Sequence, residues 1–143
     1  MEIEIFRVDK SLPLPEYQTD GSVCFDLYSR KNLAVLPGET VTVPSNFIIR
    51  TPKNLAFLLL PRSSLFSRTG FIFPHSVGVI DSDFCGKGDE ILIQLHNLGK
   101  VPSQIKKSER LAQALFVRTE KVKFREIFEI KNKTRGGFGS TKK

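Results

Sequence analysis

The six residues Ile91-Leu92-Ile93-Gln94-Leu95-His96, numbered 91–96, alternate between two kinds of side chain. Aliphatic residues at Ile91, Ile93 and Leu95 would share one face of an extended segment, because successive side chains of a β-strand point to opposite sides. This period of two predicts a half-buried strand. No segment of the chain has a convincing helical period, so we expect an all-β fold.

Short runs of the same kind lie on both sides of this segment. They cover residues 3–8, 40–43, 47–49, 55–60, 112–117 and 122–130. Turn sequences separate them, at residues 36–38, 51–54, 97–99 and 101–102. Many short strands at this spacing predict a β-sandwich, a jelly roll or a barrel.

A chain of 143 residues is most simply one domain. We expect residues 1–130 to form a single β domain and residues 131–143 to form a flexible C-terminal tail. The tail contains Arg135-Gly136-Gly137-Phe138-Gly139-Ser140-Thr141, and ordering its three glycines would cost conformational entropy. Glycine lets a backbone approach phosphates, and Phe138 offers a ring that can stack on a base.

The composition narrows the classes of partner. No run of 18 apolar residues occurs, so we expect no membrane association. Cys24 and Cys85 lack metal-ligand spacing, which favours a reduced, cytoplasmic setting. Residues 1–99 carry 9 Lys/Arg and 11 Asp/Glu, whereas residues 100–143 carry 13 and 4, so the net charge of +7 lies in the last third. That third has few aromatic residues to stack bases, so a tail that meets a polyphosphate is favoured over a nucleic-acid arm.

The segment Pro61-Arg62-Ser63-Ser64 offers a guanidinium and two hydroxyls, which are suited to phosphate oxygens. Residues 63–69 are the one plausible helical turn, closed by Gly70 and capped by Ser63 or Ser64. Taken alone, the segment is better explained by a capped turn with a surface arginine.

Asp81 follows the apolar run Val77-Gly78-Val79-Ile80, which should hold its backbone firmly. A fixed carboxylate is what a general base needs, and the ring of Phe84 gives a flat apolar surface beside it. A lone Asp after a strand is usually a turn former, and Asp83 is more simply structural.

Two further polar residues stand inside apolar runs. Asp26 lies in Cys24-Phe25-Asp26-Leu27, and Gln113 lies in Leu111-Ala112-Gln113-Ala114-Leu115. A buried amide needs a hydrogen-bond partner, although a solvent-facing strand position would also explain Gln113. The preceding residues 107–110 are a simple turn sequence to which we assign no chemistry.

These segments, in this order, resemble the five motifs of the trimeric dUTP diphosphatase (dUTPase) family. They are Cys24-Phe25-Asp26-Leu27-Tyr28-Ser29, Pro61-Arg62-Ser63-Ser64-Leu65, residues 78–86, Arg110-Leu111-Ala112-Gln113, and residues 135–141. The resemblance implies an all-β jelly roll, or distorted β-barrel, that hydrolyses dUTP to dUMP and pyrophosphate with Mg²⁺. It also implies a homotrimer with shared active sites, whose tail closes over the nucleotide.

By the same resemblance, Asp81 orients and deprotonates the attacking water. Arg62, Ser63, Ser64 and Gln113 contact the phosphates, and Asp26 organises the water shell of the magnesium ion without binding it directly. The nucleoside lies against Val79, Ile80, Phe84 and His75. In the tail, Arg135 reaches the γ-phosphate, Phe138 stacks on uracil, and Gly139 and Ser140 complete the substrate-binding segment.

The chain departs from the family pattern at several positions. The family commonly has Gly at Cys24 and Ser64 and Tyr at Phe84, and some bacterial relatives have Asn at His75. Between Gly86 and Asn97 the chain is about three residues longer than the common pattern, around Gly88-Asp89-Glu90, where we expect a bulge or a widened hairpin.

Two rival functions follow from the same residues. A dCTP deaminase shares the fold but needs a catalytic Glu three residues before Asn97, where this chain has Gln94, which cannot shuttle protons. A non-catalytic nucleotide- or nucleic-acid-binding relative would not need Asp81 or the glycine-rich tail. We therefore expect dUTP hydrolysis, and we do not expect nucleic acid as a partner.

Overall fold

The computed structural model describes residues 1–134, 136 and 137. The all-β expectation is confirmed, because short strands make up nearly all of the regular structure. The strands are β1 (Glu4–Arg7), β2 (Phe25–Tyr28), β3 (Leu33–Val35), β4 (Thr40–Pro44), β5 (Phe47–Arg50), β6 (Leu55–Pro61), β7 (Phe71–Ile72), β8 (Gly78–Ile80), β9 (Leu92–Asn97), β10 (Ser103–Ile105) and β11 (Arg110–Arg118). No helix of the described residues is long and apolar enough to cross a membrane.

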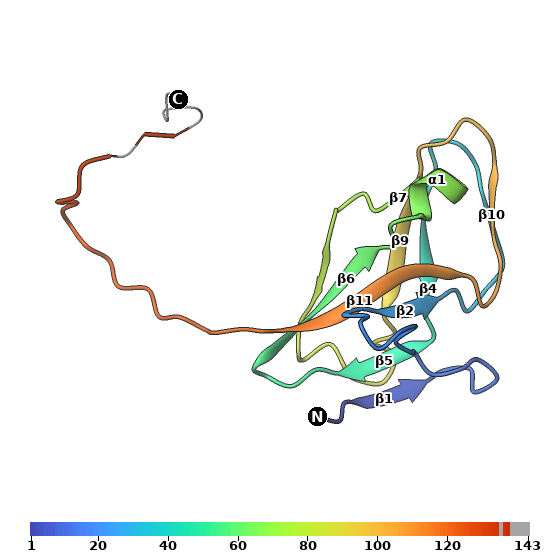
Figure 1. Ribbon diagram of the computed structural model, residues 1–143, viewed down its shortest axis with the longest axis horizontal. Helices are drawn as coiled ribbons and strands as arrows, with labels where there is room; N and C mark the ends of the chain where they lie inside the picture. Colours follow the sequence, from blue (N-terminus) through green and yellow to red (C-terminus); the bar gives the residue numbers. More distant parts are fainter. Residues whose placement is uncertain (135, 138–143) are drawn as a thin grey trace.

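The strands pair in four antiparallel groups, and most partners are distant in the sequence. The orders are β1-β5, β10-β3, β2-β11-β6-β8 and β4-β9-β7. The four-stranded sheet is the one that matters for the site, because β11 runs between β2 and β6 and is the longest strand. Figure 1 shows these layers gathered into one body, with β1 at one side and α1 at the other.

The core confirms the alternation seen in the sequence. Ile91, Ile93 and Leu95 are fully buried, whereas Leu92 between them is 48% exposed. Phenylalanine rings from β5, β6 and β7 fill the space between the sheets, since Phe47, Phe57 and Phe71 are all 0% exposed (the three largest fully buried side chains). Burying a phenylalanine side chain contributes about 2–3 kcal/mol, so these three rings are a substantial part of the core's stabilisation.

The expected helical turn is present as α1 (Leu65–Thr69), and Gly70 ends it in the left-handed conformation at φ 74°. Ser64 takes the N-cap position, but its hydroxyl makes no cap hydrogen bond, so the predicted capping bond is wrong. The N-terminal turn is instead closed by backbone, because Leu65 N–H donates to the carbonyl of Arg62 at 3.0 Å.

The strand expected over residues 122–130 is wrong for the isolated chain. β11 ends at Arg118, Thr119 N–H still donates to Asn54 O at 3.0 Å, and every residue from 120 to 134 is exposed. Figure 1 shows this orange segment running away from the body. Alternation alone cannot form a strand, because each strand needs a neighbour to take its hydrogen bonds. The domain boundary at residue 130 stays a prediction.

Candidate active site

Three strands of the four-stranded sheet bring polar side chains together at one end of β6. Asp26 on β2 is in register with Gln113 on β11, which is in register with Leu60 on β6. Arg62 follows β6 directly, and its Nε donates to Oδ1 of Asp26 at 2.8 Å. The side chains of Asp26 and Arg62 are only 7% and 21% exposed, so this ion pair is held in a fixed position.

Gln113 has the partner that its position demanded. Its Nε2 donates to the main-chain carbonyl of Pro61 at 3.0 Å, immediately before Arg62. The amide therefore ties β11 to the residue that begins the Pro61–Ser64 turn. Its side-chain oxygen is not used in this bond and is free to accept another donor.

Arg110 belongs to this cluster, although residues 107–110 were given no chemistry from the sequence. Its NH1 lies 3.2 Å from Oδ2 of Asp26 and 2.8 Å from Oε1 of Gln18. Two guanidinium groups thus share one carboxylate, which leaves a net positive charge beside Gln113. The available signal was a cation three residues before Gln113 at the start of the same strand.

A pocket of about 470 Å³ opens beside this end of β6, and residues of α1 form part of its wall. Its lining residues come from the turn, α1 and the segment after it: Pro61, Arg62, Ser63, Leu65, Phe66, Phe71, Ile72, Phe73 and Ser76. Ser63 is exposed at its edge and Ser64 is half-buried. The mixture of apolar walls with a guanidinium and a hydroxyl fits an amphipathic ligand.

The surroundings of Asp26 also shift two neighbouring pKa values. Burial raises the pKa of the Cys24 thiol, and the negative charge of Asp26 raises it further. Burial is likewise the main reason that the pKa of Tyr28 is raised, with Asp26 adding to it. Both groups are therefore neutral near pH 7, so the charge at this end of β6 comes from Asp26 and the two arginines.

Asp81 lies at the opposite end of β6. β8 pairs antiparallel with β6, with Gly78 opposite Leu59 and Ile80 opposite Phe57. Asp81 follows Ile80 and is exposed at the rim of a pocket of about 290 Å³. This pocket is lined by Lys53, Leu55, Ala56, Val79, Ile80, Asp81, Ser82, Asp83, Thr119 and Lys121.

The predicted nucleoside-contacting residues are spread along β8 and the segments on either side of it. Val79 is 62% exposed and Phe84 is 40% exposed, while Ile80 packs against the core. His75 is exposed, and its ring lies 5.7 Å from that of Phe73 at 59°. A Cβ at Gly78 would meet the Cβ of Leu59 at 3.1 Å, so a larger residue there would push β8 and β6 slightly apart. Val79 and Phe84 thus form an apolar surface that the described residues leave exposed.

Within one chain, the two groups of predicted residues do not meet. Asp81 stands beside Ala56 and Arg62 lies six residues further along β6, which corresponds to about 20 Å at the rise of a β-strand. Side chains of the Arg62 group and of Asp81 are therefore too far apart to touch within a single chain. Arg135, Phe138, Gly139 and Ser140 lie outside the residues that the structure describes.

The described residues contain no group of three or more His, Cys, Asp or Glu side chains that could hold a metal ion. Asp26, the one carboxylate that the sequence connects with magnesium, has both oxygens engaged by arginines.

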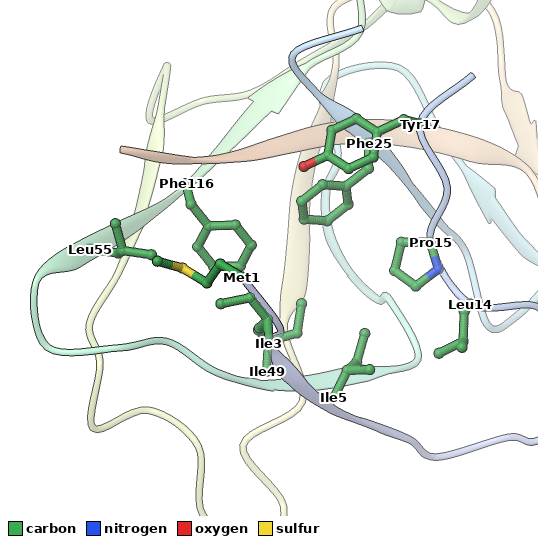
Figure 2. Close-up of a pocket in the computed structure, with 10 residues that line it drawn as sticks. All are labelled: Met1, Ile3, Ile5, Leu14, Pro15, Tyr17, Phe25, Ile49, Leu55 and Phe116. Carbon is green, nitrogen blue, oxygen red and sulfur yellow. The ribbon is translucent and has the colours of Figure 1, made fainter. Parts of the chain in front are cut away.

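A separate apolar pocket of about 400 Å³ lies on the far side of the body, between the N-terminal strand and the sheet. Figure 2 shows its side chains converging: Met1, Ile3, Ile5, Leu14, Pro15, Tyr17, Phe25, Ile49, Leu55 and Phe116. Tyr17 and Phe25 meet edge to face at 5.7 Å. None of the predicted site residues lines this pocket, and none of its lining residues has a charged side chain.

Comparison with known proteins agrees with the five motifs. The family model described as dUTPase matches residues 10–142. The deoxyuridine 5'-triphosphate nucleotidohydrolase of Dictyoglomus turgidum is 36% identical over 147 residues, covering 99% of this chain and 98% of the relative.

Solved structures agree on the fold. A mutant of the Staphylococcus bacteriophage 80alpha dUTPase, solved with dUpNHpp, superimposes with a TM-score of 0.85 at 18% identity and covers 97% of each chain. A mutant of the dUTPase from phage phi11, whose structure concerns the coordination of a structural Mg(II) ion, superimposes with a TM-score of 0.81 at 17% identity over 92% of this chain and 100% of that one. From its motifs and from its match over nearly the whole length, the chain belongs to the dUTPase family.

Proposed function

We propose that this chain is a dUTP diphosphatase, which hydrolyses dUTP to dUMP and pyrophosphate. Family membership supports the reaction class, and the relatives carry the name of a deoxyuridine triphosphate nucleotidohydrolase. The observation that carries the proposal in this chain is the Arg62–Asp26–Gln113 arrangement. In it, Asp26 orients the half-buried guanidinium of Arg62, and the amide of Gln113 lies nearby. Oriented donors of this kind are suited to binding phosphate oxygens.

The reaction needs a base, and we assign Asp81 to it. Asp81 accepts a proton from a water molecule while the water oxygen attacks the α-phosphorus in line. The bond from the α-phosphorus to the bridging oxygen then breaks, and pyrophosphate leaves. Arg62, Ser63 and Gln113 stabilise the negative charge that develops on the phosphate oxygens, with Ser64 as a further phosphate contact. Asp26 positions Arg62, because it accepts the Nε–H that would otherwise point elsewhere.

The nucleoside is assigned to the apolar surface around β8. Val79, Ile80 and the ring of Phe84 give a flat wall for the deoxyribose, and His75 stands near the base. The tail supplies the remaining contacts, with Arg135 on the γ-phosphate, Phe138 stacked on uracil, and Gly139 and Ser140 around them. Closure of the tail would exclude bulk water from the site.

Magnesium is the cofactor that fits this donor set. Mg²⁺ would be held mainly by the triphosphate and by waters, with Asp26 ordering that water shell from a distance. When bound, the ion offsets the charge of the triphosphate and makes it a better electrophile. The positive charge of Arg62 and Arg110 does part of the same task from the protein side.

We also propose a homotrimer in which each site is shared between chains. The support is the separation of about 20 Å between Arg62 and Asp81 along β6, which no small movement of side chains can close. The exposed side chains of residues 122–130 add to it, since Phe124 and Phe128 are 96% and 97% exposed. A segment of this kind is normally covered by another surface.

Complementation tests both the function and the sharing. Asp81→Asn and Arg62→Ala chains should each be nearly inactive, and refolding them together should restore dUTP hydrolysis. In a 1:1 mixture, the chain that supplies Arg62 to a site has an intact Arg62 with a probability of about one half, and the chain that supplies Asp81 has an intact Asp81 with the same probability. About a quarter of the sites should therefore have both groups. The matched control mixes Arg62→Ala with Gln113→Ala, because both defects lie in the same half and no site is repaired. Equal activity in the two mixtures would contradict shared sites.

The deaminase alternative is tested in the same assay. Gln94 lies on β9, which is in a different sheet from β8, the strand that leads to Asp81. The residue opposite Gln94 on β4 is Thr42, which is not acidic. We expect pyrophosphate from dUTP and no ammonia from dCTP. A cytoplasmic location is proposed from the two free cysteines, Cys24 and Cys85, which suit a reducing compartment.

A further inference from the structure

Glu90, which lies just before β9, forms an ion pair with Arg30, 60 residues away in the sequence. Glu90 accepts from Nε of Arg30 at 2.9 Å and from NH2 of Arg30 at 2.8 Å, so the pair is bidentate. The side chains of Glu90 and Arg30 are 12% and 23% exposed. Removing a pair of this kind from water offsets most of its attraction, so its net gain in stability is small. Fixed geometry is the larger consequence.

Glu90 has a third donor. The backbone N–H of Asn46 donates to Oε1 of Glu90 at 2.7 Å. Asn46 is fully buried and has φ 80°, a left-handed conformation that is uncommon for a residue with a side chain. One carboxylate therefore joins the segment after β2, the turn between β4 and β5, and the start of β9. Residue 90 cannot move without disturbing all three.

Residues 86–89, which precede Glu90, form a tight turn. Oδ2 of Asp89 accepts the backbone N–H of Gly86 at 2.7 Å, and Asp89 N–H donates back to Gly86 O at 3.1 Å. Gly88 has φ 100°, which lets the chain reverse between them. The position of Gly86 is thereby set by the side chain of Asp89 and, through residue 90, by Arg30.

The Asp81 loop, residues 81–85, runs directly into Gly86. Its internal contacts are local, with Phe84 N–H donating to Asp81 O at 3.2 Å and Cys85 N–H donating to Asp83 O at 3.0 Å. Among the described residues, no side-chain hydrogen bond holds Asp81 itself. At its other end the loop is held by β8, which has only three residues. Its C-terminal anchor must therefore contribute much of its placement.

We propose that Asp89 and the Glu90–Arg30 pair are positioning residues, which hold the Asp81 loop in the place where its carboxylate and the ring of Phe84 meet a substrate. The inference rests on the proposed role of Asp81 as the base. A base that lies about 20 Å from the phosphate receptor of its own chain meets a bound phosphate only in another subunit. The position of the Asp81 loop relative to the rest of its chain then decides how well Asp81 is aligned with that phosphate.

The test compares Asp89→Ala, Asp89→Asn, Lys87→Ala and Asp81→Asn in full-length protein. Asp89→Ala removes the acceptor for Gly86, so kcat for dUTP should fall about tenfold or more, while KM changes less than about threefold. Asp89→Asn keeps an acceptor oxygen and should recover most of kcat. Lys87→Ala changes the same exposed turn without touching either contact, and it should match the wild type.

Hydrogen–deuterium exchange gives a readout that does not depend on turnover. The amides of Phe84, Cys85 and Gly86 should exchange faster in Asp89→Ala than in Lys87→Ala, while the amides of β6 and β11 stay protected. Given an inactive Asp81→Asn protein, two results would overturn the positioning role. One is a wild-type kcat in Asp89→Ala, and the other is an equal loss of kcat in Asp89→Ala and Asp89→Asn. An active Asp81→Asn protein would instead refute the proposed base, and the inference would fall with it.

Discussion

The two ends of β6 are built in opposite ways. At the Arg62 end, side chains from three strands cross-link one another, and Asp26 is almost buried under two arginines. At the Asp81 end, a three-residue strand leads into an exposed loop whose contacts are mostly backbone turns. Among the described residues, the first end is cross-linked by its own side chains, whereas the second has an exposed carboxylate and exposed apolar side chains.

Under the proposed function, the Arg62 end receives the phosphates of the substrate and the Asp81 loop is brought to it. A phosphate receptor gains from rigid, oriented donors, because little reorganisation is then needed during the reaction. A loop that must meet the surface of another subunit gains from exposure instead. At the Arg62 end the ion pairs of Asp26 and the bond from Gln113 to Pro61 form within one chain, so the proposed receptor is already ordered there.

The largest effect is expected at the Asp81 end. Asp81→Asn keeps the shape of the side chain and removes the base, so turnover of dUTP should fall about 10²–10⁴-fold. Binding of a non-hydrolysable dUTP analogue should be nearly unchanged, because the proposed phosphate receptor does not include Asp81. Steady-state kinetics and calorimetric titration measure the two quantities. Near wild-type turnover would show that the base lies elsewhere.

The segment after β11 should give the next largest effect. Removing residues 135–143 takes away the proposed lid, so turnover should fall about 100-fold while folding and assembly persist. Removing residues 120–143 also takes away the exposed apolar side chains of residues 122–130, so the protein should additionally dissociate. Turnover and light scattering on both truncations separate the two roles. Full activity in the shorter truncation would remove the tail from the mechanism.

A smaller effect is expected at the Arg62 end. Asp26→Ala leaves Arg62 and Arg110 without their shared carboxylate, which should destabilise the fold by about 3 kcal/mol. Without orientation of Arg62, KM for dUTP should rise about tenfold. Asp20→Ala, at an exposed carboxylate that forms none of the described ion pairs, is the matched control. Unchanged KM in Asp26→Ala would show that Arg62 needs no positioning.

The smallest effect is expected away from both ends. The hydrogen bond from Lys107 lowers the pKa of Asp9 well below its ordinary value, with Ser11 adding to the shift. A carboxyl whose pKa is lower in the folded state than in the unfolded state stabilises the fold at any pH above the unfolded-state pKa of about 4. This stabilisation is lost as the pH falls below that value towards the folded-state pKa. Asp9→Asn should therefore be less stable than the wild type at pH 7, and the gap should narrow on acidification below about pH 4. Denaturant midpoints at neutral and acidic pH measure this, and turnover should not change.

Sequence alone determined the fold class and the family. The alternation at residues 91–96 reports a face that must be buried, and the buried Ile93 and Leu95 confirm it. The five motifs are local strings, so their order and spacing can be read without a structure. Local chemistry also indicated that Gln113 needed a partner and that a helical turn ends at Gly70, as the structure shows.

Only the tertiary structure decided which of those residues meet. The bond from Arg110 to Asp26 joins positions 84 residues apart, and the bond from Arg30 to Glu90 joins positions 60 residues apart. Periodicity states that a face is buried, but it does not state which strand lies beside it, so residues 122–130 could alternate without forming a strand. The separation of Asp81 from Arg62 has the same origin, because it follows from the antiparallel pairing of β8 with β6 and from no property of either residue.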